Sequence, residues 1–287
     1  MFYFKKNLGV GLACLLLVPI SGCNAINDIL NYKSSSKVFV NEKNLEEFNS
    51  VKISSPSENI SFIPSEYYGL EICSSDYLDP RWSIENRKLE VKINNNSNFG
   101  QTNSEKRYIN IYYPKDISFE NITINETSGD VSIPDTKVKK LSVDVVSGDI
   151  NSEIRDCDEI SAYTTSGDIN IKNNSEMYTT LDTKTVSGNI KFDGKTWNSV
   201  KARSTSGDVK MLGNLSKKST IETVSGNVGI HCNEAISNYS YDISTMNGSI
   251  AINEEKFSKM ARSFNLNNPN SLVVKTLSGD IRIDFKK

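Results

Sequence analysis

Eight polar residues recur at one place in a repeated pattern and could do chemistry together. Each directly follows a glycine, in the series Asp130, Asp149, Asp168, Asn189, Asp208, Asn227, Ser249 and Asp280. If stacked, Asp130, Asp149 and Asp168 would form a ladder of carboxylate oxygens, the ligands that Ca²⁺ prefers. The same side chains could instead satisfy backbone amides at a turn, where Asn serves as well as Asp. A calcium cage needs further oxygen ligands, so the sequence favours the turn.

Catalytic chemistry has few candidates. His231 is the only histidine and stands beside Cys232, but a nucleophile–base pair also needs a third group and an oxyanion site. No G-x-S-x-G, H-E-x-x-H or phosphate-binding glycine loop occurs. Cys73, Cys157 and Cys232 have no paired spacing, so we interpret them as small buried hydrophobes, with one disulfide and a free thiol as the alternative. We expect no metal, no cofactor and no catalysed reaction.

The ladder residues belong to an internal repeat, which recurs as TSGDVSI, VSGDINS, TSGDINI, VSGNIKF, TSGDVKM, VSGNVGI, MNGSIAI and LSGDIRI. Its glycines are Gly129, Gly148, Gly167, Gly188, Gly207, Gly226, Gly248 and Gly279, at intervals of 19, 19, 21, 19, 19, 22 and 31 residues. A period of this length suits one coil of a parallel β-solenoid.

Apolar columns flank each glycine. Two positions after it stand Val131, Ile150, Ile169, Ile190, Val209, Val228, Ile250 and Ile281, all β-branched. Seven and five positions before it, most residues are again apolar. The inward positions at minus five and plus two lie an odd number of residues apart, so the chain must bend between them, and glycine permits the bend. Another column indicates a third wall: Val138, Cys157, Tyr178 and Trp197.

We therefore predict an all-β fold, a single-stranded parallel β-solenoid (β-helix), right-handed, with coils of about 19 residues. The 31-residue interval contains residues 254–264, whose apolar residues have helical spacing, so we predict a short helix or a loop bulging from a corner. The coil around Gly279 ends at Lys287 with little chain left to cover it. An uncovered end predicts self-association through the C-terminal coil.

The stretch before the repeats has strand signals without a strict register. We predict an irregular start to the same solenoid, with residues 69–87 as a loop and 94–100 as a polar turn; a separate N-terminal β domain is the alternative. Four aromatic residues of this part, interpreted as a partly buried cap or as a sugar-stacking patch, are Tyr67, Tyr68, Tyr77 and Trp82.

The N-terminus has the pattern of a secretory leader. Lys5 and Lys6 precede an apolar run, residues 8–20, that is too short to span a bilayer. The run ends in Ile-Ser-Gly-Cys, which resembles the lipobox of bacterial lipoproteins. The resemblance implies cleavage before Cys23 and a diacylglycerol on its sulfur, a durable two-chain anchor on the extracytoplasmic side of the cell membrane. An ordinary secretory signal with an incidental Cys23 is the alternative.

The charge balance bears on partners. Of 33 basic residues, Lys5 and Lys6 lie in the leader, which leaves 31 against 35 acidic residues, a net charge of −4. No long run of one sign occurs, which argues against nucleic acid as a partner.

The strand YINIYYP, the following NITI and the serial SGD and SGN turns resemble the bacterial β-strand-repeat family of candidate adhesins, over about residues 38–287. The resemblance implies a solenoid at the cell surface and transfers no catalytic residue. The predicted divisions are residues 1–22 as signal peptide, 23–37 as lipidated spacer, 38–120 as irregular β region and 121–287 as regular solenoid.

The function predicted from these features is non-catalytic presentation of a surface that binds a protein or glycan partner. A structural or regulatory envelope protein in a membrane-stress pathway is the alternative. β-Solenoids also host polysaccharide lyases and hydrolases, but the predicted outward positions lack a carboxylate pair beside an arginine, which makes an enzyme the less favoured reading. Those outward positions include Ser132, Asn170, Lys191 and Lys210.

Overall fold

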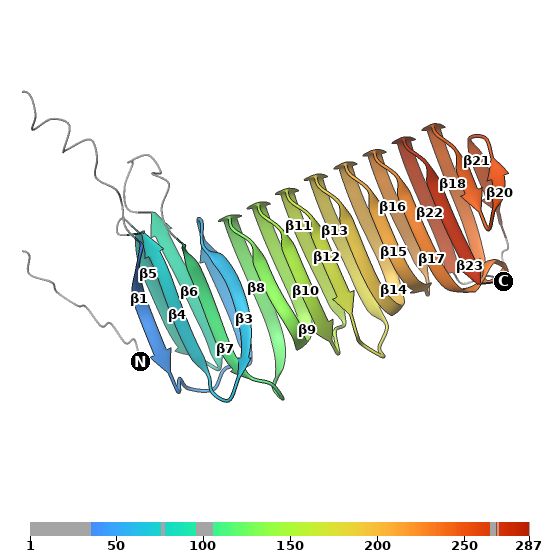
Figure 1. The fold of residues 1–287 in the computed structure, drawn as a ribbon. Coiled ribbons are helices and arrows are strands. Elements are labelled where there is room, and N and C mark those ends of the chain that lie inside the picture. The colour runs from blue at the N-terminus through green and yellow to red at the C-terminus, as the bar shows by residue number, and fades with distance from the viewer. Residues whose placement is uncertain (1–35, 76–77, 96–105, 265–267, 269, 287) are drawn as a thin grey trace, which may run out of the picture.

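The computed structural model describes residues 36–75, 78–95, 106–264, 268 and 270–286 as an elongated stack of β-strands (Figure 1). Apolar side chains alternate with polar ones along the strands, so that two facing walls bury a common core. The 23 strands of the described residues belong to one continuous sheet, because β9 (Val131–Ser147) and β14 (Ile190–Ser206) run from one wall into the other.

We call the walls A and B. Wall A runs, in spatial order, through β5 (Leu78–Glu85), β6 (Lys88–Asn95), β2 (Ser50–Ser55), β8 (Ser118–Ser128), the second part of β9, β11 (Glu159–Ser166), β13 (Thr179–Ser187), the second part of β14, β16 (Lys218–Ser225), β22 (Asn270–Ser278), β18 (Tyr239–Asn247) and β21 (Met260–Ser263).

Wall B runs through β1 (Ser36–Lys43), β4 (Gly69–Ser75), β7 (Tyr108–Pro114), β3 (Asn59–Ser65), the first part of β9, β10 (Ile150–Arg155), β12 (Ile169–Asn173), the first part of β14, β15 (Val209–Leu215), β17 (Val228–Ala235), β23 (Ile281–Lys286), β19 (Ile250–Ile252) and β20 (Glu255–Phe257). A 3-10 turn, η1 (Ile236–Asn238), precedes β18.

The predicted inward columns are confirmed. The eight residues two positions after the glycines are each at most 1% exposed. They also pair in register from coil to coil, as Ile150 does with Val131 and Ile169. The coils are parallel, since each chain segment returns to the same wall in the same direction.

The order of the coils does not follow the sequence at the C-terminal end. β22 and β23 pair with β16 and β17 on one side and with β18 and β19 on the other. The last coil in sequence, around Gly279, is therefore inserted between the coils of Gly226 and Gly248. The prediction that the Gly279 coil forms an uncovered end is wrong, and with it falls the basis for self-association through that coil.

The prediction of a helix or loop over residues 254–264 is also wrong. The segment forms β20 and β21, which pair antiparallel with β19 and β18 and cover the end of the stack. Ala261 is buried against the end coil, whereas Met260 is half exposed. Strand pairing prevails over the apolar spacing because the last coil leaves unpaired backbone groups that must be covered.

The column predicted as a third wall lies where the chain passes from wall B to wall A, and one of its predicted members is misplaced. Val138, Cys157 and Trp197 are fully buried, while Tyr178 is 62% exposed. Thr179 takes the inward place instead, pairing with Trp197 and donating its hydroxyl to the carbonyl of Cys157 at 2.5 Å. The 21-residue interval moves the inward position by one residue.

The N-terminal strands share the core of the coils, and the expected loop over residues 69–87 is wrong because it contains β4 and β5. The strand β2 lies beside β8, and β3 lies beside β7 and β9, with antiparallel neighbours closing this end. The proposed boundary near residue 120 falls inside β8.

Two further expectations lie outside the described residues: the leader with Cys23, and most of the turn at 94–100, of which residues 94 and 95 end β6. Among the residues that the structure describes, none forms an apolar helix of bilayer-spanning length.

Candidate binding surface

The corner that joins wall A to wall B is built from glycine because the coils touch there through their backbones. A Cβ atom on Gly188, whose φ is +158°, would lie 1.9 Å from the carbonyl oxygen of Gly167. The same close approach runs through the column in the spatial order Gly129, Gly148, Gly167, Gly188, Gly207, Gly226, Gly279 and Gly248. The carbonyl of Glu58 meets Gly129 at the head of the column.

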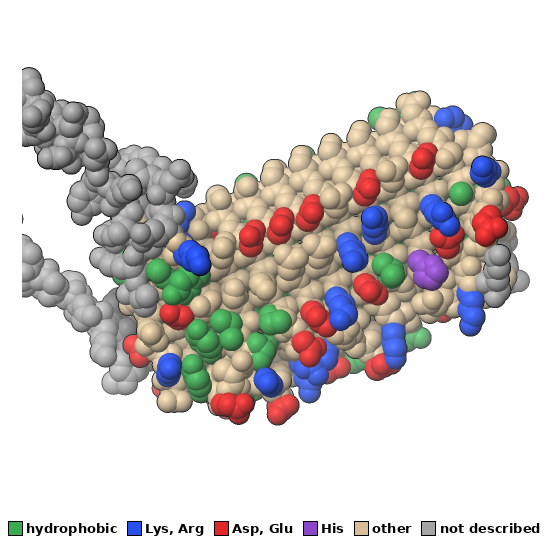
Figure 2. Space-filling view, in the orientation of Figure 1, with side chains coloured by type: hydrophobic (Ala, Val, Ile, Leu, Met, Phe, Trp, Pro, Cys, Tyr) green, Lys and Arg blue, Asp and Glu red, His purple; other side chains and the backbone are tan. Residues whose placement is uncertain are grey.

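The predicted ladder lies along this corner, and its acidic members form a row in Figure 2. The amide of Asp149 donates to Oδ1 of Asp130 at 2.9 Å, and the amide of Asp168 donates to Oδ1 of Asp149 at 2.8 Å. The bonds continue to the amide of Ser249, and at the other end Asn59 accepts from the amide of Asp130. The geometry is that of a hydrogen-bonded turn.

The cation hypothesis for Asp130, Asp149 and Asp168 gains no support from this arrangement. One oxygen of each carboxylate accepts an amide of the next coil. Among the described residues, no group of three His, Cys, Asp or Glu side chains could hold a metal ion. Cation binding by the ladder stays an untested prediction.

A buried row of hydroxyl groups supports the corner and was missed from the sequence. The hydroxyl of Thr185 donates to the carbonyl of Gly167 at 3.2 Å, and that of Thr223 donates to the carbonyl of Gly207 at the same distance. Equivalent bonds come from Thr164, Ser204, Thr245 and Thr276. The signal was available, because Thr or Ser stands three residues before six of the eight glycines.

Two buried carboxyl groups, those of Glu58 and Glu126, interact at the head of the glycine column, where Glu58 takes the place of a glycine. This pair was not predicted from the sequence. Glu58 is fully buried and accepts hydrogen bonds from the hydroxyls of Ser55, at 2.6 Å, and Ser74. The pKa of Glu126 is raised to about 7, mainly by burial and in smaller part by the Glu58 carboxyl, against the hydrogen bonds from Ser128 and Ser55, which lower it. The Glu126 carboxyl is therefore largely protonated below neutral pH.

The outer face of wall B carries a tyrosine cluster near the N-terminal end, made of Tyr67, Glu71, Tyr108, Asn110 and Tyr112. The Glu71 carboxylate accepts from the hydroxyls of Tyr108, at 3.0 Å, and Tyr112, at 3.1 Å, and from the Asn110 amide at 3.0 Å. Burial alone would raise the pKa of Glu71, but these bonds hold it below its usual value. The ring of Tyr67 stacks on that of Tyr112 with centroids 5.8 Å apart.

The structure does not bring the four predicted aromatic residues together. Tyr67 joins the tyrosine cluster, whereas Tyr68 packs on Phe48 with ring centroids 4.9 Å apart. Trp82 is partly buried against the core on wall A, and Tyr77 lies outside the described residues.

A polar strip continues from the tyrosine cluster across neighbouring strands of wall B. Its members pair in register in the order Ser61, Ser132, Asn151 and Asn170. The Asn170 amide donates to Oδ1 of Asn151 at 3.0 Å. The face is hollowed here into a shallow depression of about 370 Å³, with Ser132, Asn151 and Asn170 on its floor. Its lining also includes Lys191 and three charged side chains from the edge of the face, Glu153, Lys172 and Asp193.

The strip ends at a lysine pair. Lys191 is in register with Asn170 on one side and with Lys210 on the other. The two ammonium groups belong to adjacent strands, and neither Lys191 nor Lys210 forms an ion pair with any described residue. Figure 2 shows these features on one face: green side chains over β3 and β7, then a tan strip, then blue side chains.

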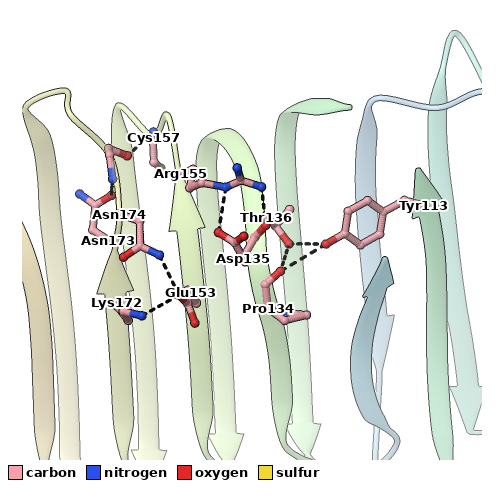
Figure 3. A network of polar contacts seen from close by, with 11 residues as sticks. Tyr113, Pro134, Asp135, Thr136, Glu153, Arg155, Cys157, Lys172, Asn173 and Asn174 are labelled. Carbon is pink, nitrogen blue, oxygen red and sulfur yellow. Dashed lines mark hydrogen bonds and ion pairs between the residues drawn. The ribbon is translucent and has the colours of Figure 1, made fainter. Parts of the chain in front are cut away.

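The opposite edge of this face is braced by ion pairs and hydrogen bonds between coils (Figure 3). Arg155 pairs with Asp135 at 2.8 Å, and Lys172 pairs with Glu153 at 2.7 Å. The hydroxyl of Tyr113 lies 2.6 Å from that of Thr136 and ties β7 to β9. These contacts fix the spacing of the strands beneath the polar strip.

The candidate catalytic residues are not assembled into a site. His231 is exposed on wall B, and Cys232 beside it is buried with its pKa raised by burial to about 12. Cys73, Cys157 and Cys232 are buried, and none of them forms a disulfide with another described residue, which confirms their interpretation as buried hydrophobes.

The comparisons with known proteins agree with this architecture. The family model Toastrack DUF4097 matches residues 48–284. A candidate adhesin from Bacteroides fragilis is 16% identical with a TM-score of 0.50, covering 88% of this chain and 97% of that one. A candidate adhesin from Parabacteroides merdae is 15% identical with a TM-score of 0.35, covering 90% and 98%.

A candidate lipid-binding protein from Parabacteroides distasonis is 12% identical with a TM-score of 0.43, covering 88% of this chain and 97% of that one. No curated protein matches the chain. At 16% identity and a TM-score of 0.50, the likeness to the Bacteroides fragilis structure shows a shared fold and nothing more. The family model covers most of the coils and both walls, so the chain belongs to the Toastrack DUF4097 family of β-rich domains.

Proposed function

We propose that this protein is a non-catalytic lipoprotein of the cell envelope that binds an extracytoplasmic protein or glycan partner through the outer face of its solenoid. The observation that carries the proposal is the continuous row of polar side chains in register across wall B. Stacked coils hold such a row rigid, which reduces the entropy lost on binding. Right-handed winding of single-stranded coils is part of the proposal.

The binding test uses the chain from residue 24 onward, in which the lipidated cysteine is absent. The protein is applied to a glycan array and used for cross-linking capture from whole cells. A reproducible glycan or extracellular protein supports the proposal, whereas no capture by either method contradicts it. Capture of envelope proteins alone would favour the structural or regulatory role in membrane stress, and glycan cleavage would restore the lyase or hydrolase hypothesis.

The anchor is tested separately. We expect the full chain to fractionate with membranes and to incorporate a radiolabelled fatty acid. The variant Cys23→Ala should lose the label because the acceptor sulfur is gone. A Cys14→Ala variant, changed within the leader, is the control and should keep the label. Equal labelling of both variants would contradict lipidation at Cys23.

A further inference from the structure

We infer that the tyrosine cluster, the polar strip and the lysine pair form one extended site for a linear glycan chain that carries carboxylate groups. The inference rests on the proposed binding function and deepens it, because it names the ligand class and places the site on one face of one wall. The site runs across the coils from β7 to β15, in the order β7, β3, β9, β10, β12, β14 and β15. At ~4.8 Å per strand this path is roughly 29 Å long, enough for several sugar units.

The tyrosine cluster provides aromatic surface beside fixed hydrogen-bonding groups. Tyr108 and Tyr112 are half-buried and lie four residues apart on β7, an even number, so both project from the outer face. Their hydroxyls donate to Glu71, which leaves their oxygens as acceptors for ligand hydroxyls. The apolar ring of a tyrosine can stack on the face of a sugar ring, while its hydroxyl can hydrogen-bond to hydroxyl groups at the edge of the sugar.

The polar strip offers donors and acceptors, and none of its four members, Ser61, Ser132, Asn151 and Asn170, is apolar. Amide groups of Asn151 and Asn170 and the hydroxyl of Ser132 line the depression at intervals of one strand. Each amide carries both a donor and an acceptor, so it can pair with hydroxyl groups in either direction. A protein partner would instead be expected to meet a more apolar centre, which this strip lacks. The repeated spacing fits a ligand that is itself a repeating polar chain.

The lysine pair indicates that the ligand is negatively charged. Like charges directly opposite each other on adjacent strands destabilise a sheet. Lys191 and Lys210 hold that arrangement without an ion pair in the described part of the chain, while Lys172 on the neighbouring strand β12 is paired with the Glu153 carboxylate. A ligand carboxylate between the two ammonium groups would relieve the repulsion.

The first experiment measures glycan binding after two lysines are removed from wall B or, as a control, from wall A. An array of linear oligosaccharides, half neutral and half containing uronate, is probed with the chain from residue 24 onward. We expect binding to uronate-containing chains, weakened at least about fivefold by the double variant Lys191→Ala/Lys210→Ala and by added salt. The control is Lys184→Ala/Lys275→Ala, which removes the same charge from two exposed residues on the outer face of wall A and should leave binding unchanged.

Two further variants test the remainder of the site. Asn151→Trp fills the depression from an exposed position and should abolish binding, whereas Ser142→Trp places the same ring on wall A. Tyr112→Ala should weaken binding, with Tyr163→Ala on wall A as its control. Thermal unfolding of each variant shows whether the fold is retained. If Tyr112→Ala unfolds, the variants at the exposed residues Asn151, Lys191 and Lys210 still test the site.

The outcomes separate the inference from the function it rests on. Binding that survives Asn151→Trp, or that wall A variants reduce equally, overturns the site. A strict preference for neutral chains overturns the assignment to carboxylate-bearing glycans. If no array glycan binds while cross-linking still captures an extracellular protein, this inference fails and the proposed function stands; if neither method captures a partner, both fail.

Discussion

At the scale of single residues, the corner shows why eight equivalent positions accept only glycine. It also shows why the corresponding position at the head of the column holds a glutamate, Glu58. Each of the eight glycines faces the backbone carbonyl of the coil before it in the stack, and a Cβ atom would lie too close to that carbonyl. At the head of the column the chain instead reads Ser57-Glu58-Asn59, and Glu58 turns its side chain into the core. This exchange creates the buried carboxyl pair with Glu126.

The carboxyl pair makes stability depend on pH. Burial raises the folded-state pKa of Glu126 to about 7 from an unfolded value of 4.5. The fold therefore favours the protonated group, so its stabilising contribution is complete below pH 4.5 and is lost as pH rises through 7. We expect the free energy of unfolding to fall by up to roughly 3 kcal/mol over this range.

Substitution of Glu126→Gln should remove this pH dependence, because the amide keeps the hydrogen-bonding shape without a titrating proton. Urea unfolding at pH 4.5 and pH 8 measures it, with the exposed Glu66→Gln as control. The wild type should gain stability at the lower pH relative to the Gln variant. Equal pH dependence of wild type and Glu126→Gln would contradict the assignment.

The glycine column gives a second residue-scale prediction. Gly207→Ala should lower the free energy of unfolding by at least about 2 kcal/mol, because the new Cβ would lie 2.0 Å from the carbonyl oxygen of Gly188 at a φ of +149°. Gly229→Ala is the matched control, since its Cβ would meet only a Lys210 side-chain carbon at 3.9 Å. Similar unfolding midpoints for the two variants would show that the column tolerates a side chain.

At the scale of elements, the ends of the stack differ from the coils between them. Parallel strands dominate the regular coils, whereas antiparallel strands cover both ends. Sheet ends expose backbone groups that invite association, and short covering strands remove that exposure. The segment β20–β21 belongs to this class of cap, which explains why its apolar residues do not form a helix.

The cap can be tested through its one fully inward residue. Ala261 pairs with Ile243 of β18 and is 3% exposed. Ala261→Asp should detach β21, because a buried unpaired carboxylate costs more than a short strand pairing provides. Hydrogen exchange of β18 amides measures this, and Met260→Asp, 49% exposed in the wild type, is the control. Unchanged protection of β18 in Ala261→Asp would contradict the capping role.

At the scale of the whole molecule, the inserted coil makes the C-terminus part of the interior of the stack. The coil of Gly279 contacts the coils of Gly226 and Gly248 through both walls. Because each coil is stabilised mainly by its neighbours, the end coil depends on a segment made after it. Folding of this end therefore awaits completion of the chain.

Deletion of residues 270–287 should leave the end coil without its neighbour. We expect loss of hydrogen-exchange protection in β18 and β19, while β11 and β12, several coils away, keep theirs. Deletion of residues 286 and 287 alone is the control and should have little effect. Full protection of β18 and β19 in the long deletion would mean that the end coil docks directly on β16 and β17.

The repeating coil, its inward columns and the glycine corner could be predicted from the amino-acid sequence, because they follow from a period that each coil repeats. The ladder could be predicted for the same reason, although its hydrogen bonds to the next amide could not. The order of the coils could not be predicted, because Gly248 and Gly279 carry similar motifs and nothing in their local sequence tells which neighbours they pair with. The Glu58 and Glu126 pair and the surface from Tyr112 to Lys210 likewise combine strands distant in sequence, so their proximity follows from register between strands.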